Sequence, residues 1–250
     1  MQQDHISTGI IYSVPLEQSL HVIQKSPLRA VLELFRYIAF GEGLFLSPVT
    51  ELSILVHSAQ IDDSGHFIPN QLADAPKLPD LEIQPIHWNI SEPPIPHSEG
   101  LPLVALFLAS ENPLERPACD LGYFSDPADY AVMRKGIKLA KRIGEKMREH
   151  GVKMTDMYMP VSESDAHLDA FVREFTRTNY HYASTCRMGP ENDTHPGVVD
   201  NELRVHGISN LRIVDCSIIP IMISAHPQAP AVMIAEKCAD MIKATYEVRT

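Results

Sequence analysis

Two short runs near the carboxyl end of the chain decide its fold: HYASTCRMG at residues 181–189 and SAHPQAP at residues 224–230. Each run carries one histidine, His181 in the first and His226 in the second. Imidazole has an ordinary pKa close to neutrality, so a facing pair suits proton transfer to or from an alcohol or carbonyl oxygen. Because the chain has 12 histidines, this pattern is weak by itself, and most single histidines serve structure or the surface.

The sequence between and after these runs predicts the elements that hold them. Residues 197–220 are typical of two short strands joined by polar turns, then a third strand at 211–214 that ends at Asp215. Over residues 231–246 the apolar side chains recur three and four positions apart, as in an amphipathic helix. The predicted order is loop, strands, loop and helix, with one imidazole in each loop.

The two runs and the residues between them resemble the carboxyl-terminal signature of the glucose-methanol-choline (GMC) oxidoreductases, which are FAD-dependent alcohol oxidases and dehydrogenases. The similar segments read N-Y-H, S-T-C-x-M-G, G-V-V-D-x-x-L-R-V-x-G-I-x-N-L-R-I-V-D-x-S and H-P-Q-A-P. They follow in order over roughly 70 positions, far more than a chance motif match gives. Near the amino end, Gln3, Asp4 and His5 resemble N-L-x-D-H, the motif at which GMC chains leave the cofactor domain.

The resemblance implies roles for particular residues. It implies that His181 is the base that takes the alcohol proton while hydride goes to the flavin, and that His226 hydrogen-bonds the substrate oxygen. Tyr180, next to His181, is expected in the wall of the substrate pocket, with core packing as the alternative. The positions expected to bind the flavin are Asp215, at the end of the strand that meets the cofactor, and Pro227 and Gln228 beside the isoalloxazine.

Some features depart from the family pattern. Ser184 replaces the usual glycine before Thr185, and so adds a Cβ where backbone approaches closely, while Cys216 stands where a Gly or Ala is common. The sequence has no G-x-G-x-x-G unit to grip an ADP pyrophosphate. Its only G-x-G, at residues 41–43, follows a predicted helix rather than a strand, which argues against a dinucleotide site.

The whole sequence predicts an α+β fold, with a mostly antiparallel sheet, helices packed on one face, and carboxyl-terminal strands and a helix derived from an FAD-binding domain. The predicted helices cover residues 27–40, 128–150 and 164–177, and the predicted strands cover residues 10–15, 52–56, 81–88 and 103–109. The resemblance divides the chain into a linker remnant of the FAD domain (1–25), a substrate-binding-like domain (26–178) and a catalytic segment that returns to the FAD domain (179–250).

Composition excludes several classes of protein. A formal charge of −11 argues against a nucleic-acid surface, which needs clustered Lys and Arg. No run approaches the roughly 18 to 20 apolar residues of a membrane span, and the amino end does not resemble a signal peptide, so we expect a cytoplasmic protein. The four cysteines show no C-x-x-C pair, which favours buried thiols, and we predict no metal site.

Two functions of different class follow. The first is GMC-type oxidation of a small-molecule alcohol with FAD, of which this chain would be a truncated carboxyl-terminal portion. The alternative is a cofactor-independent cyclase, isomerase or lyase in which His181 and His226 perform acid–base chemistry. Without an FAD half, an apolar face stays exposed, so we expect either a homodimer or a partner that supplies that half.

Overall fold

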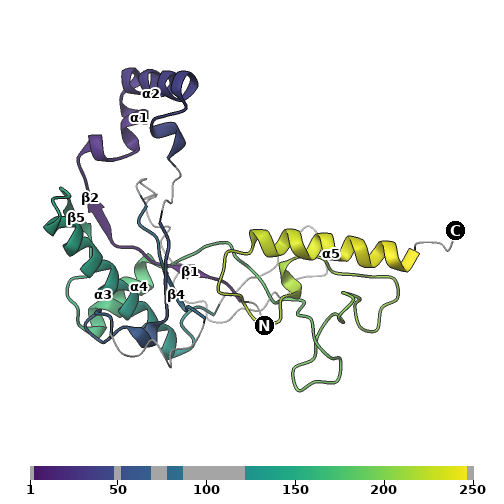
Figure 1. Cartoon of the computed structure of the whole chain (residues 1–250). Helices are drawn as coiled ribbons and strands as arrows, with labels where there is room; N and C mark the ends of the chain where they lie inside the picture. The colour runs from purple at the N-terminus through teal and green to yellow at the C-terminus, as the bar shows by residue number, and fades with distance from the viewer. Residues whose placement is uncertain (1–2, 48–51, 69–77, 87–121, 247–250) are drawn as a thin grey trace, which may run out of the picture. The chain divides into compact units, whose positions relative to one another are not determined.

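The computed structural model describes residues 3–47, 52–68, 78–86 and 122–246, and the chain divides into two compact units (Figure 1). Unit 1 comprises residues 1–7, 98–125 and 177–250, and unit 2 comprises residues 8–97 and 126–176. Unit 1 therefore joins segments from both ends of the sequence. The three domains expected from the resemblance stay a prediction.

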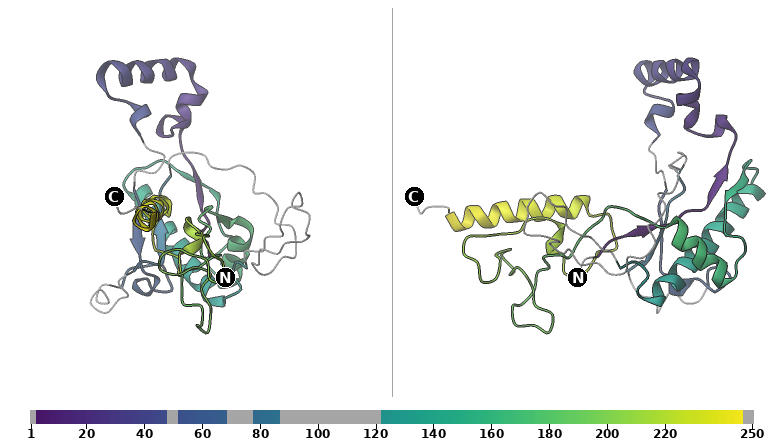
Figure 2. Two further views of the ribbon diagram at one scale, coloured as in Figure 1. Left: turned by 90° about the vertical axis from the view of Figure 1, so that its right-hand side faces the viewer. Right: turned by 180° about the vertical axis from the view of Figure 1, so that it is seen from behind.

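Helices α3 (Pro127–Glu149) and α4 (Asp165–Phe175) pack side by side in unit 2 (Figure 2). Asp126 caps α3, because its carboxylate accepts a hydrogen bond from the Ala128 N–H at 2.8 Å. Arg134 of α3 donates two bonds to the Asp169 carboxylate of α4, at 2.6 and 2.7 Å. The helices predicted at 128–150 and 164–177 are confirmed, with ends that differ by one or two residues.

Helix α2 (Pro27–Phe40) has the bounds that local signals predict. The Ser26 hydroxyl accepts from the Arg29 N–H at 3.3 Å, and Pro27 occupies the first turn. Gly41 ends the helix in the left-handed region with a φ of 64°. Helix α1 (His21–Lys25) and the 3-10 helix η2 (Leu44–Leu46) pack on α2. The G-x-G sequence therefore follows a helix rather than a strand, as the sequence predicted.

The named strands form three separate antiparallel pairs. The pairs are β1 (Ile6–Ser7) with β6 (Arg177–Thr178), β2 (Ile11–Ser13) with β5 (Thr155–Tyr158), and β3 (Ile54–Val56) with β4 (Leu81–Ile83). The α+β class is confirmed. The strands predicted at 10–15, 52–56 and 81–88 are present but shorter, and the strand predicted at 103–109 lies outside the described residues.

The segment at 197–220 corrects the prediction of three strands. It forms isolated bridges instead, in which Val199 pairs with Met188 and Val205, and Arg204 pairs with Arg212. Leu203 and Asn210 adopt left-handed backbone conformations, with φ of 65° and 61°. Such residues turn the chain and interrupt a regular ladder, so the predicted strand at 211–214 is reduced to one bridge.

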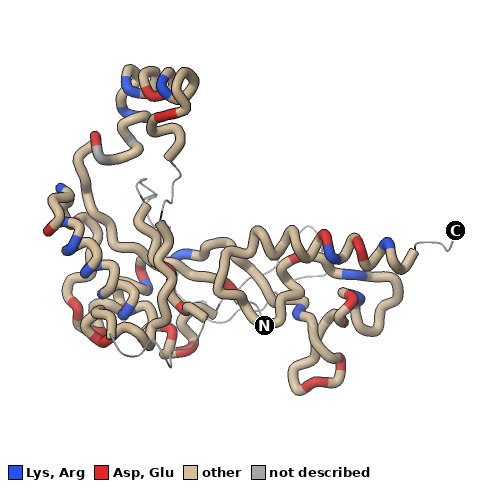
Figure 3. Tube along the Cα trace, in the orientation of Figure 1, with Lys and Arg blue, Asp and Glu red and all other residues tan. Residues whose placement is uncertain are grey.

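Helix α5 (Gln228–Tyr246) covers this looped segment in unit 1. The buried core beneath it contains Val199, Leu203, Ile218 and Cys238, with Met241 of α5 packed against them. The helix predicted at 231–246 is confirmed and begins three residues earlier. Figure 3 shows that the charged positions of α5 begin near its middle, and residues 228–235, next to His226, are uncharged.

Three observations concern only the part of the chain that the structure describes. Its three cysteines are free thiols, with Cys238 buried and Cys186 and Cys216 partly buried. No group of three His, Cys, Asp or Glu side chains there is arranged to hold a metal ion. None of the helices there is both long enough and apolar enough to cross a membrane.

Candidate active site

Asp4 fixes the loop that carries His181, and both lie in unit 1. One carboxylate oxygen of Asp4 accepts from the His181 backbone N–H at 2.9 Å. The other accepts from the Thr178 hydroxyl at 2.6 Å and from the Tyr123 hydroxyl. Two of these donors lie three positions apart in the His181 loop and the third is Tyr123, so one carboxylate fixes where the loop begins and how His181 is presented.

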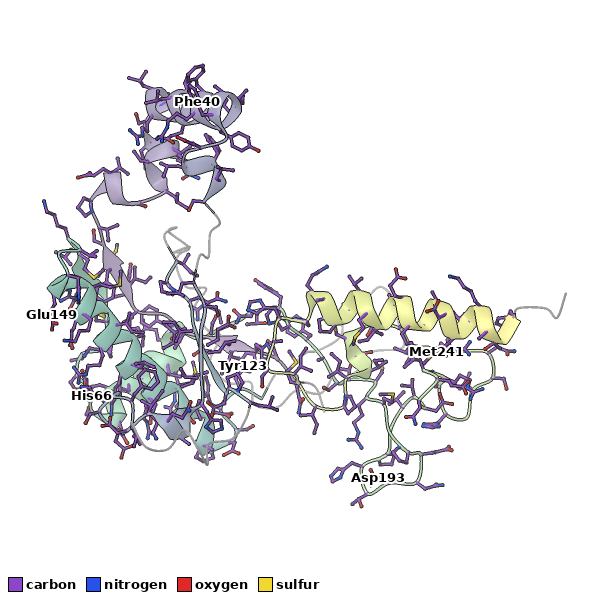
Figure 4. All side chains as sticks on the ribbon, in the orientation of Figure 1. Phe40, His66, Tyr123, Glu149, Asp193 and Met241 are labelled. Carbon is purple, nitrogen blue, oxygen red and sulfur yellow. The ribbon has the colours of Figure 1, made fainter. Side chains whose placement is uncertain are left out.

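Tyr123, labelled in Figure 4, is held as a hydrogen-bond donor in this arrangement. Burial raises the pKa of its phenol, and the bond to the Asp4 carboxylate raises it further. A neutral phenol keeps its hydrogen and donates it to Asp4. The bond therefore persists throughout the neutral pH range.

Gln3 fastens the other side of the same loop. Its backbone forms an antiparallel bridge with Ala183, with N–O distances of 3.0 and 2.9 Å. Its side-chain oxygen accepts from the Met222 N–H and from the Ser184 hydroxyl, the latter at 3.3 Å. Gln3 thus joins the first histidine loop to the segment that leads to the second.

His181 and His226 face each other across these two loops. Their ring centroids are 5.0 Å apart and the ring planes meet at 65°. His181 is partly buried and His226 is exposed, so the pair opens to solvent on the His226 side. The structure brings the two predicted residues together, and their chemical roles stay predictions.

His5 adds a third imidazole that the sequence reasoning did not assign to the site. Its Nδ1 lies 2.9 Å from Nδ1 of His181, and its Nε2 lies 2.9 Å from the carbonyl oxygen of Ile223. The signal that could have found it was the D-H pair at positions 4–5. Its contact with His181 spans 176 positions, so no local pattern reveals the pairing.

The contacts of His5 assign the hydrogens of neutral rings. The Ile223 carbonyl oxygen can only accept, so Nε2 of His5 carries a hydrogen and its Nδ1 has the lone pair. The hydrogen between the two Nδ1 atoms therefore belongs to His181. A neutral His181 that is protonated on Nδ1 has its lone pair on Nε2, which makes Nε2 the proton-accepting atom.

Tyr180, the expected pocket residue, and Ser184, where close backbone approach was expected, lie at the ends of the segment around His181. The Tyr180 side chain is 79% exposed, so the core-packing alternative is wrong, and a role in a pocket wall stays a prediction. Ser184 is buried and has a left-handed φ of 72°. Its N–H bonds the Cys216 carbonyl oxygen at 3.3 Å. A glycine would adopt this conformation without the cost that a Cβ brings.

The expected flavin-binding residues lie on two connected segments. Asp215 is exposed and caps the 3-10 helix η4 (Cys216–Ile218), accepting from the Ser217 N–H at 2.7 Å. Pro227 precedes Gln228, the first residue of α5. The Cys216 thiol lies 3.9 Å from the Pro227 carbonyl oxygen, which connects the Asp215 turn to the amino end of α5.

A separate pocket of about 480 Å³ lies in unit 2, between α3 and the turn at residues 61–68. Phe67, Leu139, Ile143 and Met147 give it an almost wholly apolar lining. Arg142 at its rim is paired with Glu145 and Glu163 within the protein. It contains none of the predicted site residues, so the candidate active site is the histidine cluster of unit 1.

Solved structures contain the same fold over about half of their length. Solved structures of similar fold include a formate oxidase, with a TM-score of 0.73, 23% identity, and coverage of 98% of this chain and 47% of that one. An FAD-dependent oxidoreductase from Chaetomium thermophilum has a TM-score of 0.75 at 19% identity, with coverage of 99% and 48%. At these identities the likeness concerns the fold alone.

Sequence comparison identifies the family. A family profile described as GMC oxidoreductase matches residues 105–235, more than half of the chain. The chain therefore belongs to the GMC oxidoreductase family, as the two histidine runs indicated.

The relatives are longer proteins. Human mitochondrial choline dehydrogenase is 34% identical over 248 residues, which cover 96% of this chain and 40% of that protein. Alcohol dehydrogenase [acceptor] of Pseudomonas putida is 32% identical over 247 residues, which cover 96% and 43%. The chain thus spans less than half the length of these relatives.

Proposed function

We propose that this chain supplies the substrate side of a GMC-type active site, which oxidises a small-molecule alcohol and passes hydride to FAD. The observation that carries the proposal is the imidazole cluster of unit 1. His226 faces His181 with ring centroids 5.0 Å apart, and His5 sets the tautomer of His181 through a 2.9 Å contact. Names of relatives point to alcohols and choline as the first substrates to test.

The residues of this chain would act on the hydroxyl group of the substrate. His226 donates a hydrogen bond to the substrate oxygen and holds it near His181. Nε2 of His181 takes the hydroxyl proton, after which both ring nitrogens carry hydrogen and the bond to His5 has a charged donor. Asp4 holds the His181 backbone at 2.9 Å, which keeps the base in place during the transfer.

FAD fits part of this site. The turn at Asp215 adjoins the amino end of α5, where Pro227 and Gln228 stand next to His226. The positive amino end of a helix suits a ring that gains negative charge, and FAD would supply hydride acceptance there. The chain has no glycine-rich turn for the pyrophosphate, so we propose that residues outside this sequence hold that part.

Two further expectations concern the cofactor-independent alternative and the location of the protein in the cell. None of the relatives described above is a cyclase, isomerase or lyase, so no observation favours the cofactor-independent alternative. A cytoplasmic location is a proposal that rests on sequence composition, and cell fractionation with an antibody to the protein tests it.

Turnover in site variants tests the proposal. We expect the chain, assembled with FAD and the flavin-binding part of a GMC protein, to reduce a dye acceptor with choline or a primary alcohol. His181→Ala should lower kcat by about 10²–10⁴-fold, and His226→Ala by somewhat less. His195→Ala is the matched control, because His195 is an exposed histidine elsewhere in unit 1. Full turnover in both site variants would show that the assignment is wrong.

A further inference from the structure

Two side chains from the amino end of the chain hold the backbone that leads to His226. This backbone lies in neither a helix nor a strand. The Met222 N–H donates to the side-chain oxygen of Gln3. The next residue, Ile223, accepts at its carbonyl oxygen from Nε2 of His5 at 2.9 Å. Side chains two positions apart thus fix one short stretch of backbone just before the second imidazole.

Gln3 is also joined to the other histidine loop, through its own backbone. It pairs with Ala183 in an antiparallel bridge whose N–O distances are 3.0 and 2.9 Å. Ala183 is buried and lies two positions after His181. The backbone of Gln3 is therefore tied to the first loop, while its side chain reaches the second. One residue spans the two histidine loops.

The bond to Met222 requires an acceptor at the end of the Gln3 side chain. A backbone N–H can only donate, so the amide atom that faces it is the oxygen. The Ser184 hydroxyl donates to the same oxygen at 3.3 Å, and a carbonyl oxygen has lone pairs for both donors. Without this oxygen, the bond at Ile223 is left to hold the segment at one point, about which it can pivot.

The contacts of Gln3 differ in kind from those of its two neighbours. Asp4 holds the His181 backbone, and His5 contacts the His181 ring. Gln3 bonds the backbone of both loops, two positions after His181 and four positions before His226. Gln3 is therefore placed to set how the second loop lies against the first.

We propose that Gln3 is a positioning residue, which acts through Met222 to hold His226 opposite His181. Its effect on turnover rests on the proposed function, in which His226 orients the substrate oxygen toward the base. The two ring centroids are 5.0 Å apart in this arrangement. A displacement of the second loop by about 1 Å misaligns the substrate hydroxyl with the accepting nitrogen, and misplacements of that size lower rates severely.

Proton NMR of the chain with labelled histidine measures this arrangement without cofactor or substrate. The ring protons of His181 and His226 should show a nuclear Overhauser effect (NOE) in the wild type. Gln3→Met keeps the length of the side chain but has no amide oxygen, and the NOE should fall at least about threefold. Gln3→Asn, which is one methylene shorter, should give the same loss. Gln3→Glu has a carboxylate oxygen at the required position and should retain the NOE.

Ser184→Ala is the matched control for these variants. It removes one of the two bonds that the Gln3 oxygen accepts and keeps the bond from Met222, so the NOE should not change. In the assembled enzyme, Gln3→Met should lower kcat about tenfold and leave the flavin absorbance unchanged.

The outcomes separate this inference from the proposed function. An NOE that is unchanged in Gln3→Met, absent from the wild type, or lost equally in Gln3→Glu overturns the positioning role. A Gln3-dependent NOE in a chain whose assembled enzyme oxidises no alcohol supports the positioning role and contradicts only the proposed function. Slow hydrogen exchange at the Ala183 amide confirms that the first loop is folded in each variant.

Discussion

Two carboxylates, Asp4 in unit 1 and Glu33 in unit 2, each accept a hydrogen bond from a backbone N–H, but the surroundings that they organise differ. Each accepts from a distant backbone N–H, Asp4 from His181 across 177 positions and Glu33 from Leu44 across 11. Asp4 draws a loop inward and builds a site that holds three imidazoles. Glu33 draws charge inward and leaves an apolar surface outside. A carboxylate that accepts from a distant backbone N–H thus positions a histidine cluster in one region and fixes a helix against its neighbours in the other.

Removal of Asp4 should have the largest effect on the folded state. Asp4→Ala leaves the Tyr123 hydroxyl, the Thr178 hydroxyl and the His181 N–H without their acceptor. We expect a loss of about 2–3 kcal/mol in the free energy of unfolding, measured by urea denaturation. Tyr123→Phe removes one donor and should cost about 1 kcal/mol. Equal losses in the two variants would mean that Asp4 does not organise the loop.

The Glu33 arrangement is tested at Gly43, where φ is 104° and an added Cβ would lie 2.5 Å from the Glu33 carboxylate. Gly43→Ala therefore adds a collision to an unfavourable backbone conformation, and we expect about 2–3 kcal/mol of local destabilisation. Hydrogen exchange of the α2 amides measures it.

Gly41→Ala is the matched control for that experiment. Gly41 has a φ of 64° and open space where its Cβ would be, so only the backbone penalty of about 1 kcal/mol applies. If both alanines accelerate exchange in α2 equally, contact with Glu33 does not fix the helix.

The sequence predicts those parts of the molecule that local chemistry specifies. The bounds of α2 follow from Ser26, Pro27 and Gly41, which cap and end the helix within a few residues of one another. The two histidine runs were found from their residue types and from the order in which their motifs follow one another. Ser184 was singled out as a place of close approach, and its left-handed φ gives the reason.

Features that depend on distant contacts could not be predicted in this way. The position of His5 depends on bonds to residues 176 and 218 positions away. The absence of a strand at 211–214 depends on left-handed turns at Leu203 and Asn210, and neither residue is a glycine that would have indicated a turn. Burial of Glu33 within α2 could not be predicted either, because it depends on a bond from Leu44, which lies outside the helix.

His5 tests whether the Asp4 region is a chemical site as well as a rigid one. A glutamine can donate to the Ile223 carbonyl and accept from Nδ1 of His181, whereas a leucine can do neither. We expect His5→Leu to lower kcat of the assembled enzyme about tenfold, and His5→Gln to retain most of it. Nitrogen-15 NMR of His181 gives a readout independent of turnover, because the Nδ1–H form should persist in His5→Gln and decrease in His5→Leu. An unchanged tautomer in both would contradict a positioning role.

The smallest effect is expected at a carboxylate that is held by side chains alone. Arg134 lowers the pKa of Asp169 through their hydrogen bonds, and both groups are about one-fifth to one-quarter exposed. A lowered pKa in the folded state contributes stability above the ordinary aspartate value of 3.8, and that contribution is lost as the pH falls through the folded value. Arg134→Met should therefore cost less than about 1 kcal/mol at pH 7 and nearly nothing at pH 2. If Arg134→Met lowers the free energy of unfolding at pH 7 as much as Asp4→Ala does, a backbone donor is not what makes Asp4 and Glu33 more important than a surface pair.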